Sequence, residues 1–234
     1  MYGDLNIVIP AKNEALTVGD IIDQCALYSP NIFVVDGHST DNTLDIARNH
    51  GARLITDNGK GKGDAIRSVI PHLEKGITVF IDADGSHDPK DIPRLIQPIL
   101  LDEADHVSGS RLIGGSSELH GGFEECFRLM GSSFITACIN WRFKVRLSES
   151  QNGFRAIRTE LLKTLPLKEK ITTIEQEMII KTLAMGYRIS EVPTHEYCRK
   201  SGKSTIRLGK VWFRYVYTLI KYLFFSFQGR IRSE

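Results

Sequence analysis

Two carboxylates separated by a single residue are the sharpest chemical signal in the sequence. Asp82-Ala83-Asp84 ends the run 77–82, whose apolar character is typical of a buried strand. Side chains two apart in a strand point the same way, so we expect both carboxylates to face one spot. Hard oxygen ligands suit Mg²⁺ or Mn²⁺, and such ions bridge to phosphate oxygens. The pattern predicts a metal-assisted phosphate site at Asp82 and Asp84. The simpler alternative is a helix-capping Asp beside a solvated one.

Other polar residues also follow apolar runs. Asp36 ends one such run and can accept a hydrogen bond from a ribose hydroxyl or a base amide, or it can cap a helix that begins near Ser39. Gly61-Lys62-Gly63 opens a predicted helix, where backbone N–H groups and Lys62 can meet a phosphate. Asp41 is interpreted as a charge at a helix N-terminus. Neither a Walker A loop nor a dinucleotide fingerprint is present.

The elements that must position these residues alternate in the first half of the chain. Expected strands lie at 5–10, 31–36, 52–56, 77–82 and 105–108. Expected helices lie at 14–26, 39–49 and 62–72, with another that begins at Asp88. Such alternation predicts an α/β fold, with a mostly parallel sheet flanked by helices. In such sheets, ligands bind at the carboxyl ends of the strands.

The pattern changes after residue 110. The sequence predicts a Gly/Ser-rich loop at 113–122, helices at 123–143 and 173–185, and a strand at 187–192. A basic loop at 199–206 and a final aromatic helix at 207–227 follow. No repeat or low-complexity linker divides the chain. We therefore expect a catalytic domain over 1–206 and a C-terminal helix and tail over 207–234.

Composition and charge narrow the class of protein. With 234 residues, of which 41% are hydrophobic and 25% charged, the chain is globular, and disordered and fibrous classes are excluded. A net charge of +2 does not indicate a nucleic-acid partner. Residues 199–234 nevertheless carry +8 and residues 1–198 carry −6. The four cysteines lack zinc spacing and suggest a reducing compartment. With no signal peptide or spanning segment in the sequence, we expect a cytoplasmic protein.

Taken in order, these motifs resemble family 2 glycosyltransferases of the GT-A fold. The resemblance rests on Pro10-Ala11-Lys12-Asn13-Glu14, Val34-Val35-Asp36-Gly37, Gly61-Lys62-Gly63-Asp64 and Asp82-Ala83-Asp84-Gly85. Gly109-Ser110-Arg111 and Asn152-Gly153-Phe154-Arg155 make the chain similar to the dolichol-phosphate mannosyltransferase-like branch, which loads a sugar onto a polyprenyl phosphate. The chain departs from that branch at Gly37, Ser86 and Asn152, where the branch often has an acid, Gln and Ser.

The resemblance implies roles for particular residues. The nucleotide sugar would contact Pro10, Asn13, Glu14, Asp36, Lys62 and Asp82. Asp82 and Asp84 would hold Mg²⁺ or Mn²⁺ on the diphosphate. The acceptor phosphate would contact Arg111, Arg128, Ser132, Arg199 and Lys203. The residues expected to act in catalysis are Asp84, Arg111 and Arg199, because a metal and planar guanidinium groups stabilise the departing diphosphate.

The acceptor class decides whether a general base is needed. A hydroxyl acceptor requires one, whereas a phosphate is already ionised near neutral pH. The sequence lacks the Q-x-x-R-W signature of polysaccharide synthases. Glu175 and Glu177 lie where other family members place a base, and they can instead be supporting or surface acids.

The helix expected at 207–227 bears on the same question. At 100° per residue, one stripe contains Arg207, Lys210, Arg214, Thr218 and Lys221, and aromatic residues surround it. This combination predicts contact with an anionic membrane surface. The alternative is packing against the catalytic domain or a second subunit.

Together these features predict a glycosyltransferase on the cytoplasmic face of a membrane. It would move a hexose or N-acetylhexosamine from a nucleotide-diphosphate sugar to a polyprenyl phosphate, with inversion. Alternatives are a soluble glycosyltransferase with a hydroxyl acceptor, a sugar-phosphate nucleotidyltransferase that releases pyrophosphate, and a non-catalytic membrane adaptor. The intact Asp82 and Asp84 pair argues against the adaptor. Formation of a homo-oligomer stays open.

Overall fold

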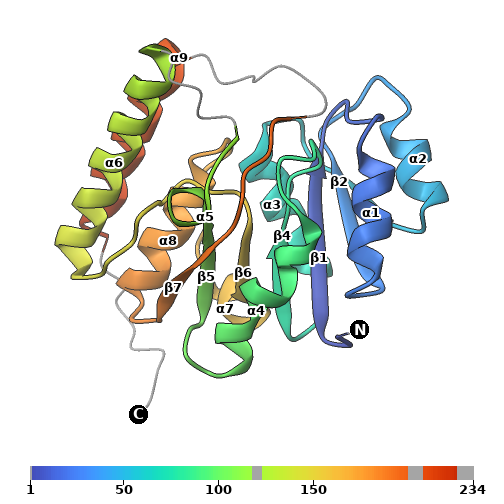
Figure 1. Cartoon of the computed structure of the whole chain (residues 1–234), viewed down its shortest axis with the longest axis horizontal. Coiled ribbons are helices and arrows are strands. Elements are labelled where there is room, and N and C mark those ends of the chain that lie inside the picture. Colours follow the sequence, from blue (N-terminus) through green and yellow to red (C-terminus); the bar gives the residue numbers. More distant parts are fainter. Residues whose placement is uncertain (1, 118–122, 200–207, 226–234) are drawn as a thin grey trace.

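The computed structural model describes residues 2–117, 123–199 and 208–225, and a seven-stranded sheet forms its centre (Figure 1). The strand order is β3-β2-β1-β4-β6-β5-β7. The strands are β1 (Leu5–Ala11), β2 (Asn31–Asp36), β3 (Arg53–Thr56), β4 (Ile77–Phe80), β5 (His106–Ser110), β6 (Arg155–Arg158) and β7 (Ile189–Pro193). The helices are α1 (Val18–Ala26), α2 (Thr43–Asn49), α3 (Lys62–Val69), α4 (Ile92–Leu100), α5 (Arg111–Gly114), α6 (Phe123–Phe143), α7 (Thr159–Thr164), α8 (Ile174–Ala184) and α9 (Leu208–Leu223), with short 3₁₀ turns η1 (Ile70–His72) and η2 (Pro89–Asp91).

Half of the sheet is the predicted parallel arrangement. β1 pairs in parallel with β2 and β4, and β2 pairs in parallel with β3. All six residues of β2 and all four of β4 are buried, as expected for strands covered on both faces. The register places Ala11 beside Asp36, so the carboxyl ends of β1 and β2 lie together. The expectation of a mostly parallel α/β sheet flanked by helices is confirmed.

Strand β6 was not expected from the sequence. It runs antiparallel between β4 and β5, and its first residue, Arg155, lies opposite Phe80 at the end of β4. The Asn152-Gly153-Phe154 motif therefore enters the sheet next to the residues that follow β4. The pattern missed it because the strand has only four residues, two of them arginines, and neither period 2 nor an apolar run stands out.

Apolar residues pack on both faces of the sheet. On one face, Ile7 and Val79 pack in a cluster that includes Leu95 of α4. On the other, Val8 and Phe80 pack in a cluster that includes Met178 of α8. Successive side chains of β1 and β4 thus pack into two apolar cores, one on each face of the sheet. These cores fix the positions of the strand ends.

Helix α9 packs beside α6 at one end of the molecule (Figure 1). Leu219, Tyr222 and Leu223 enter a third apolar cluster that also contains residues of α6 and α8. Within the predicted basic stripe, Thr218 is buried and Lys221 donates to Glu169 at 2.9 Å. Arg214 of the same stripe is exposed, so only part of the stripe contacts the protein as in the packing alternative. Arg207 and the side chain of Lys210 lie outside the described part of the chain.

The side of α9 that faces away from this third cluster is apolar and exposed. Its exposed large residues are Phe213, Tyr217, Ile220 and Phe224. Among the helices that the structure describes, none has the length and hydropathy to cross a bilayer. The helix expected at 207–227 extends over Leu208–Leu223 in the structure. Its role at a membrane surface remains a prediction.

Candidate active site

The loops that follow β1 and β2 are tied to each other. Asn13 has a positive φ of 57°, and its backbone N–H donates to Ser39 Oγ at 2.9 Å. Its side-chain oxygen accepts from the Thr40 backbone N–H at 2.8 Å. Asn tolerates the left-handed conformation better than most residues. The predicted nucleotide-binding residues Pro10, Asn13 and Asp36 therefore share one edge of the sheet.

Asp36 accepts hydrogen bonds from the backbone of the turn that follows β2, and it does not cap α2, whose N-cap is Asn42. Its buried carboxylate accepts from the Ser39 N–H, at 3.2 and 3.1 Å to the two oxygens. Asp41 accepts from the Thr43 N–H at 3.0 Å and from the Ala15 N–H at 3.2 Å, so it is a charge at the N-terminus of α2. Helix α2 begins at Thr43, later than the Ser39 or Thr40 start that the sequence predicted, because the intervening residues form these turns. Contact between Asp36 and a ribose stays a prediction.

Lys62 connects Asp82 to Glu175. Its ammonium lies 2.6 Å from Asp82 Oδ1 and 2.7 Å from Glu175 Oε1. Burial lowers the pKa of Lys62, but the two carboxylates outweigh burial and hold that pKa above its usual range. For Asp82, burial raises the pKa, and Lys62 together with His87 and Arg199 more than reverses this effect. Lys62 and Asp82 therefore stabilise each other in the charged form.

Gly153 explains why the Asn-Gly-Phe-Arg motif lies here. A Cβ atom at this position would lie 2.5 Å from Lys62 Nζ and 2.6 Å from Asp82 Oδ2. Both distances are too short for any side chain. The glycine lets the backbone of the β6 entrance approach the ion pair closely.

Asp84 has a different set of partners. Strand β4 ends at Phe80, so both aspartates lie in the turn that follows it and not on the strand itself. Asp84 Oδ1 accepts from the Ser86 N–H at 3.0 Å and from Ser86 Oγ at 2.6 Å. Its Oδ2 lies 3.3 Å from Arg199 Nε. Each aspartate thus faces its own cation, Lys62 or Arg199.

The residues present fit a divalent cation bound together with a diphosphate. The described part of the chain contains no group of three or more His, Cys, Asp or Glu side chains arranged as metal ligands. Mg²⁺ needs only one or two carboxylates when phosphate oxygens complete its shell. Glu14 lies where a cation would be stabilised, because its buried Oε2 atom has no hydrogen-bond partner. Burial and then the nearby Asp84 raise the pKa of Glu14 to about 7.

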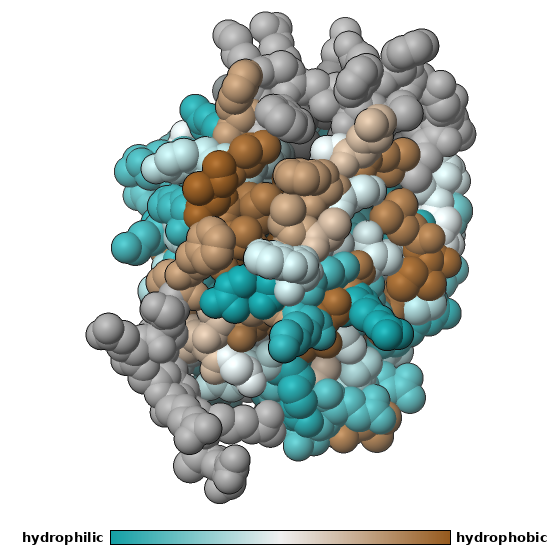
Figure 2. Space-filling view, turned by 90° about the vertical axis from the view of Figure 1, so that its left-hand side faces the viewer, coloured by the Kyte–Doolittle hydropathy of each residue, from teal (hydrophilic) through white to brown (hydrophobic). Residues whose placement is uncertain are grey.

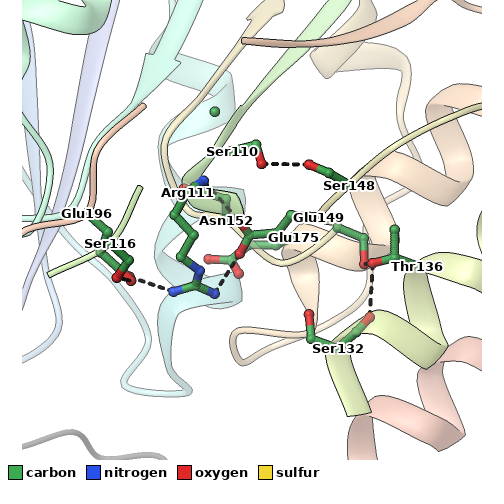
Figure 3. A network of polar contacts seen from close by, with 12 residues as sticks. Ser110, Arg111, Ser116, Ser132, Thr136, Ser148, Glu149, Asn152, Glu175 and Glu196 are labelled. Carbon is green, nitrogen blue, oxygen red and sulfur yellow. Dashed lines mark hydrogen bonds and ion pairs between the residues drawn. The ribbon is translucent and has the colours of Figure 1, made fainter. Parts of the chain in front are cut away.

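Arg111 lies in a second polar network (Figure 3). Its two terminal nitrogens lie 2.6 Å from Glu149 Oε1 and 2.5 Å from Glu196 Oε1. Ser116 Oγ donates to the other oxygen of Glu196 at 2.9 Å. Burial raises the pKa of Glu149, and Arg111 opposes that effect. A phosphate would have to share Arg111 with these two carboxylates.

The structure brings together only part of the predicted acceptor site. The Ser132 carbonyl accepts from Thr136 Oγ1, which is 2.9 Å from Ser150 Oγ, so Ser132 lies on the side of α6 that faces the segment before β6. The side chain of Arg128 and all of Lys203 fall outside the described part of the chain. Their contact with phosphate stays a prediction.

Glu175 and Glu177 have different environments. Glu177 accepts from the backbone N–H groups of Lys168 and Glu169 and from Lys181 Nζ at 2.5 Å, so its oxygens are fully used away from Asp82. Glu175 alone of the two reaches the site, through Lys62.

Sequence reasoning missed three residues of the site. His87 Nε2 lies 3.9 Å from Asp82 Oδ2, and its ring stacks on Phe154 with centroids 5.1 Å apart. Glu149 and Glu196, the partners of Arg111, are the others. His87 follows the D-x-D motif closely and could have been noticed. The two glutamates carried no local signal, since chain segments 38 and 85 residues away bring them to Arg111.

A pocket of about 550 Å³ opens beside this turn. It lies between α1 and the segment after β7, and its lining comprises Thr17, Asp20, Ile21, Gln24, Gly85, His87, Asp88, Pro89, Lys90, Ser117, Tyr197 and Cys198. The pocket thus meets the site at Gly85 and His87, next to the buried Asp84.

The chain is similar in sequence to sugar transferases of two archaea. The chain is 28% identical to a dolichyl-phosphate hexose transferase of Haloferax volcanii, over 88% of this chain and 87% of that one. It is 29% identical to a UDP-N-acetylglucosamine–dolichyl-phosphate N-acetylglucosaminyltransferase of Methanococcus voltae, over 89% and 93%.

Among solved structures, the fold is similar to that of glucosyl-3-phosphoglycerate synthase from Mycobacterium tuberculosis in complex with Mn²⁺, UDP and phosphoglyceric acid. The TM-score is 0.77 at 22% identity, over 97% of this chain and 81% of that one. The model of glycosyl transferase family 2 matches residues 6–165, more than half of the chain. The carboxylates and cations at the strand ends thus belong to a member of glycosyl transferase family 2.

Proposed function

We propose that this glycosyltransferase moves a sugar from a nucleotide-diphosphate sugar to a polyprenyl phosphate, with a divalent cation and with inversion. The observation that carries the proposal is the pair of carboxylates at the end of β4, each facing one cation, Lys62 or Arg199. The names of the Haloferax and Methanococcus relatives support the lipid phosphate as acceptor. Residues 1–206 would carry the chemistry, and the helix and tail at 207–234 would contact the membrane.

The donor would bind along the ends of β1, β2 and β4. Pro10, Asn13, Glu14 and Asp36 would contact the nucleoside. Asp82 and Asp84 would hold Mg²⁺ or Mn²⁺, which would neutralise charge on the departing diphosphate. Arg199 offers a planar group that can bind the same diphosphate through two hydrogen bonds.

The acceptor chemistry requires no general base. A polyprenyl phosphate is already ionised near neutral pH and can attack the anomeric carbon directly, opposite the departing diphosphate. Arg111, Arg128, Ser132 and Lys203 would bind this phosphate. The environment of Glu175 agrees with such a reaction, because its carboxylate is paired with Lys62.

An exposed apolar surface supports binding at a membrane. Large exposed residues of α6 and α9 gather on one end of the molecule, and Figure 2 shows brown residues over this face. This surface comprises Met130, Phe134, Trp141, Phe213, Tyr217, Ile220 and Phe224. Four exposed cations lie on the same two helices or just after α6: Arg142, Lys144, Arg146 and Arg214. Apolar and aromatic side chains flanked by cations suit the interface of an anionic leaflet.

The test is a panel of nucleotide sugars with short polyprenyl phosphates and Mg²⁺ or Mn²⁺. We expect one sugar to appear on the lipid phosphate, with a nucleoside diphosphate as the second product. Release of pyrophosphate instead would assign a nucleotidyltransferase. Transfer to water-soluble alcohols but not to lipid phosphates would reassign the acceptor.

A further inference from the structure

Glu175 is a buried acid within the site, and its geometry limits what it can do. Its side chain is 5% exposed, and Oε1 lies 2.7 Å from Lys62 Nζ. Arg155 is fully enclosed and donates to the Glu175 backbone carbonyl at 2.9 Å. The first turn of α8 is therefore fixed, and the carboxylate cannot reach an acceptor without leaving its cation in a buried place. Breaking such a pair from one side is strongly unfavourable.

Lys62 is held from two sides. Asp82 Oδ1 takes the ammonium from one direction and Glu175 Oε1 from the other. The close approach of Gly153 bounds the pair on a third side. Next to Lys62 along the chain, the backbone of α3 packs closely against the segment before α8. A Cβ atom on Gly63 would lie only 2.6 Å from the Glu169 carbonyl oxygen. The position of the ammonium is thus determined by Glu175 as much as by Asp82.

The charges of the three groups sum to −1. Lys62 alone would neutralise Asp82 and leave the turn after β4 with little attraction for a divalent cation. Glu175 restores one negative charge on the far side of the ammonium. Because Glu175 also interacts with the ammonium of Lys62, Lys62 occupies only Oδ1 of Asp82, and Oδ2 can bind another cation.

We propose that Glu175 is a positioning residue that holds Lys62 against Asp82 and so maintains the affinity of Asp82 for a metal-bound diphosphate, and that it is not the general base. This inference rests on the proposed function, because it assumes that Asp82 binds the cation and diphosphate of the donor. It assigns Glu175 a role that acts through Lys62 and not on the acceptor.

The first experiment replaces Glu175 by Gln, which preserves the shape and removes the charge. Binding of Mn²⁺ with UDP or GDP is measured by calorimetry, next to donor kinetics from pH 5 to 9. We expect the dissociation constant of Mn²⁺ and the donor KM to rise about tenfold, the size of one charge interaction in a partly screened site. The acid limb of the rate profile should be unchanged. The control is Glu160→Gln, a change of the same type at an exposed position of α7.

A base would behave differently, since its loss lowers kcat by about 10²- to 10⁴-fold and removes the acid limb of the rate profile. That result, with metal binding intact, overturns the inference. If the wild type binds neither UDP nor GDP with Mn²⁺, the proposed function itself is wrong, so the two failures are distinct.

A second comparison covers the case in which Glu175→Gln does not fold. The double variant Lys62→Met with Glu175→Gln leaves no unpaired cation and is compared with Lys62→Met alone. A residue that acts through Lys62 and not on the acceptor has no further effect on kcat once Lys62 is absent. An additional loss of kcat in the double variant contradicts the inference.

Discussion

Arg199 Nε lies 3.3 Å from Asp84 Oδ2, so the segment after β7 is paired with the turn after β4. The backbone supports this contact: Tyr197 N–H donates to the Ser86 carbonyl at 2.9 Å, and Glu196 forms an antiparallel bridge with His87. Glu196 also binds Arg111. One short segment thus links the predicted donor and acceptor sides of the site.

The first prediction concerns Arg199. Arg199→Ala should lower kcat/KM by roughly 10- to 150-fold, the range for loss of a charge-assisted hydrogen bond. Arg199→Lys should recover little of this, because a point charge cannot replace a planar group. Steady-state kinetics with the preferred donor would measure both. Wild-type turnover in Arg199→Ala would remove this residue from the site.

The second prediction concerns Asp84. Asp84→Asn should abolish binding of Mn²⁺ with a nucleoside diphosphate while the fold persists, since the carboxylate is the charge that a cation would meet. The melting temperature should not fall, because the change removes a like charge that acts on Glu14. Calorimetric titration and a thermal melt would test both parts, with the surface change Asp45→Asn as control. Undiminished metal binding would show that the metal assignment is wrong.

The third prediction follows from the pKa of Glu14, which is raised from 4.5 to about 7. Between these values the folded state holds a proton that the unfolded state has lost, so stability falls as pH rises through this window. Glu14→Gln has no titrating group at this position, so its stability does not fall in this way as the pH rises. Its melting temperature, relative to wild type, should therefore be higher at pH 8 than at pH 5. An equal difference at both pH values would contradict the shift.

The fourth prediction concerns Gly153. A Cβ atom at this position must displace Lys62 or Asp82. Gly153→Ala should therefore weaken donor binding by at least about tenfold, equivalent to 1.4 kcal/mol. Gly3→Ala is the matched control, since nothing lies within 4 Å of its added Cβ. Equal donor affinity in the two variants would mean that the ion pair does not bind the donor.

The fifth prediction concerns the exposed surface of α6 and α9. Trp141→Ser with Tyr217→Ser should reduce co-sedimentation with anionic vesicles, and added salt should reduce it further. Binding of nucleotide and metal should persist. Leu27→Ser, a similar change at an exposed residue just after α1, serves as control. Vesicle binding that survives in the double variant would point to another surface.

The parallel half of the fold was predictable because its strands are apolar runs that alternate with helices, and Asp36 and Asp82 come directly after such runs. The helix over Phe123–Phe143 and the one over Ile174–Ala184 also follow the expected ranges closely. Local patterns of hydrophobicity carry this information. The start of a helix at Lys62 follows from them as well.

The partners of the charged residues could not be predicted. Arg111 meets Glu196 only because β5 and β7 pair in parallel, and Lys62 meets Glu175 across 113 residues of sequence. Such pairings depend on strand order, which no local pattern encodes. The basic stripe of α9 was recognised, but its contact with Glu169 depends on how the helix rotates against α8.

The contacts of α9 with the segment before α8 have a consequence for the order of synthesis. Tyr215 Oη donates to Thr172 Oγ1 at 2.7 Å, and Lys221 binds Glu169, so α9 supports the residues that lead into Glu175. Translation delivers this segment before it delivers α9. A nascent chain that has not yet extended past Lys221 therefore has the sheet and both aspartates but lacks this outer support. The residues that lead into Glu175 gain these contacts only once α9 has left the ribosome.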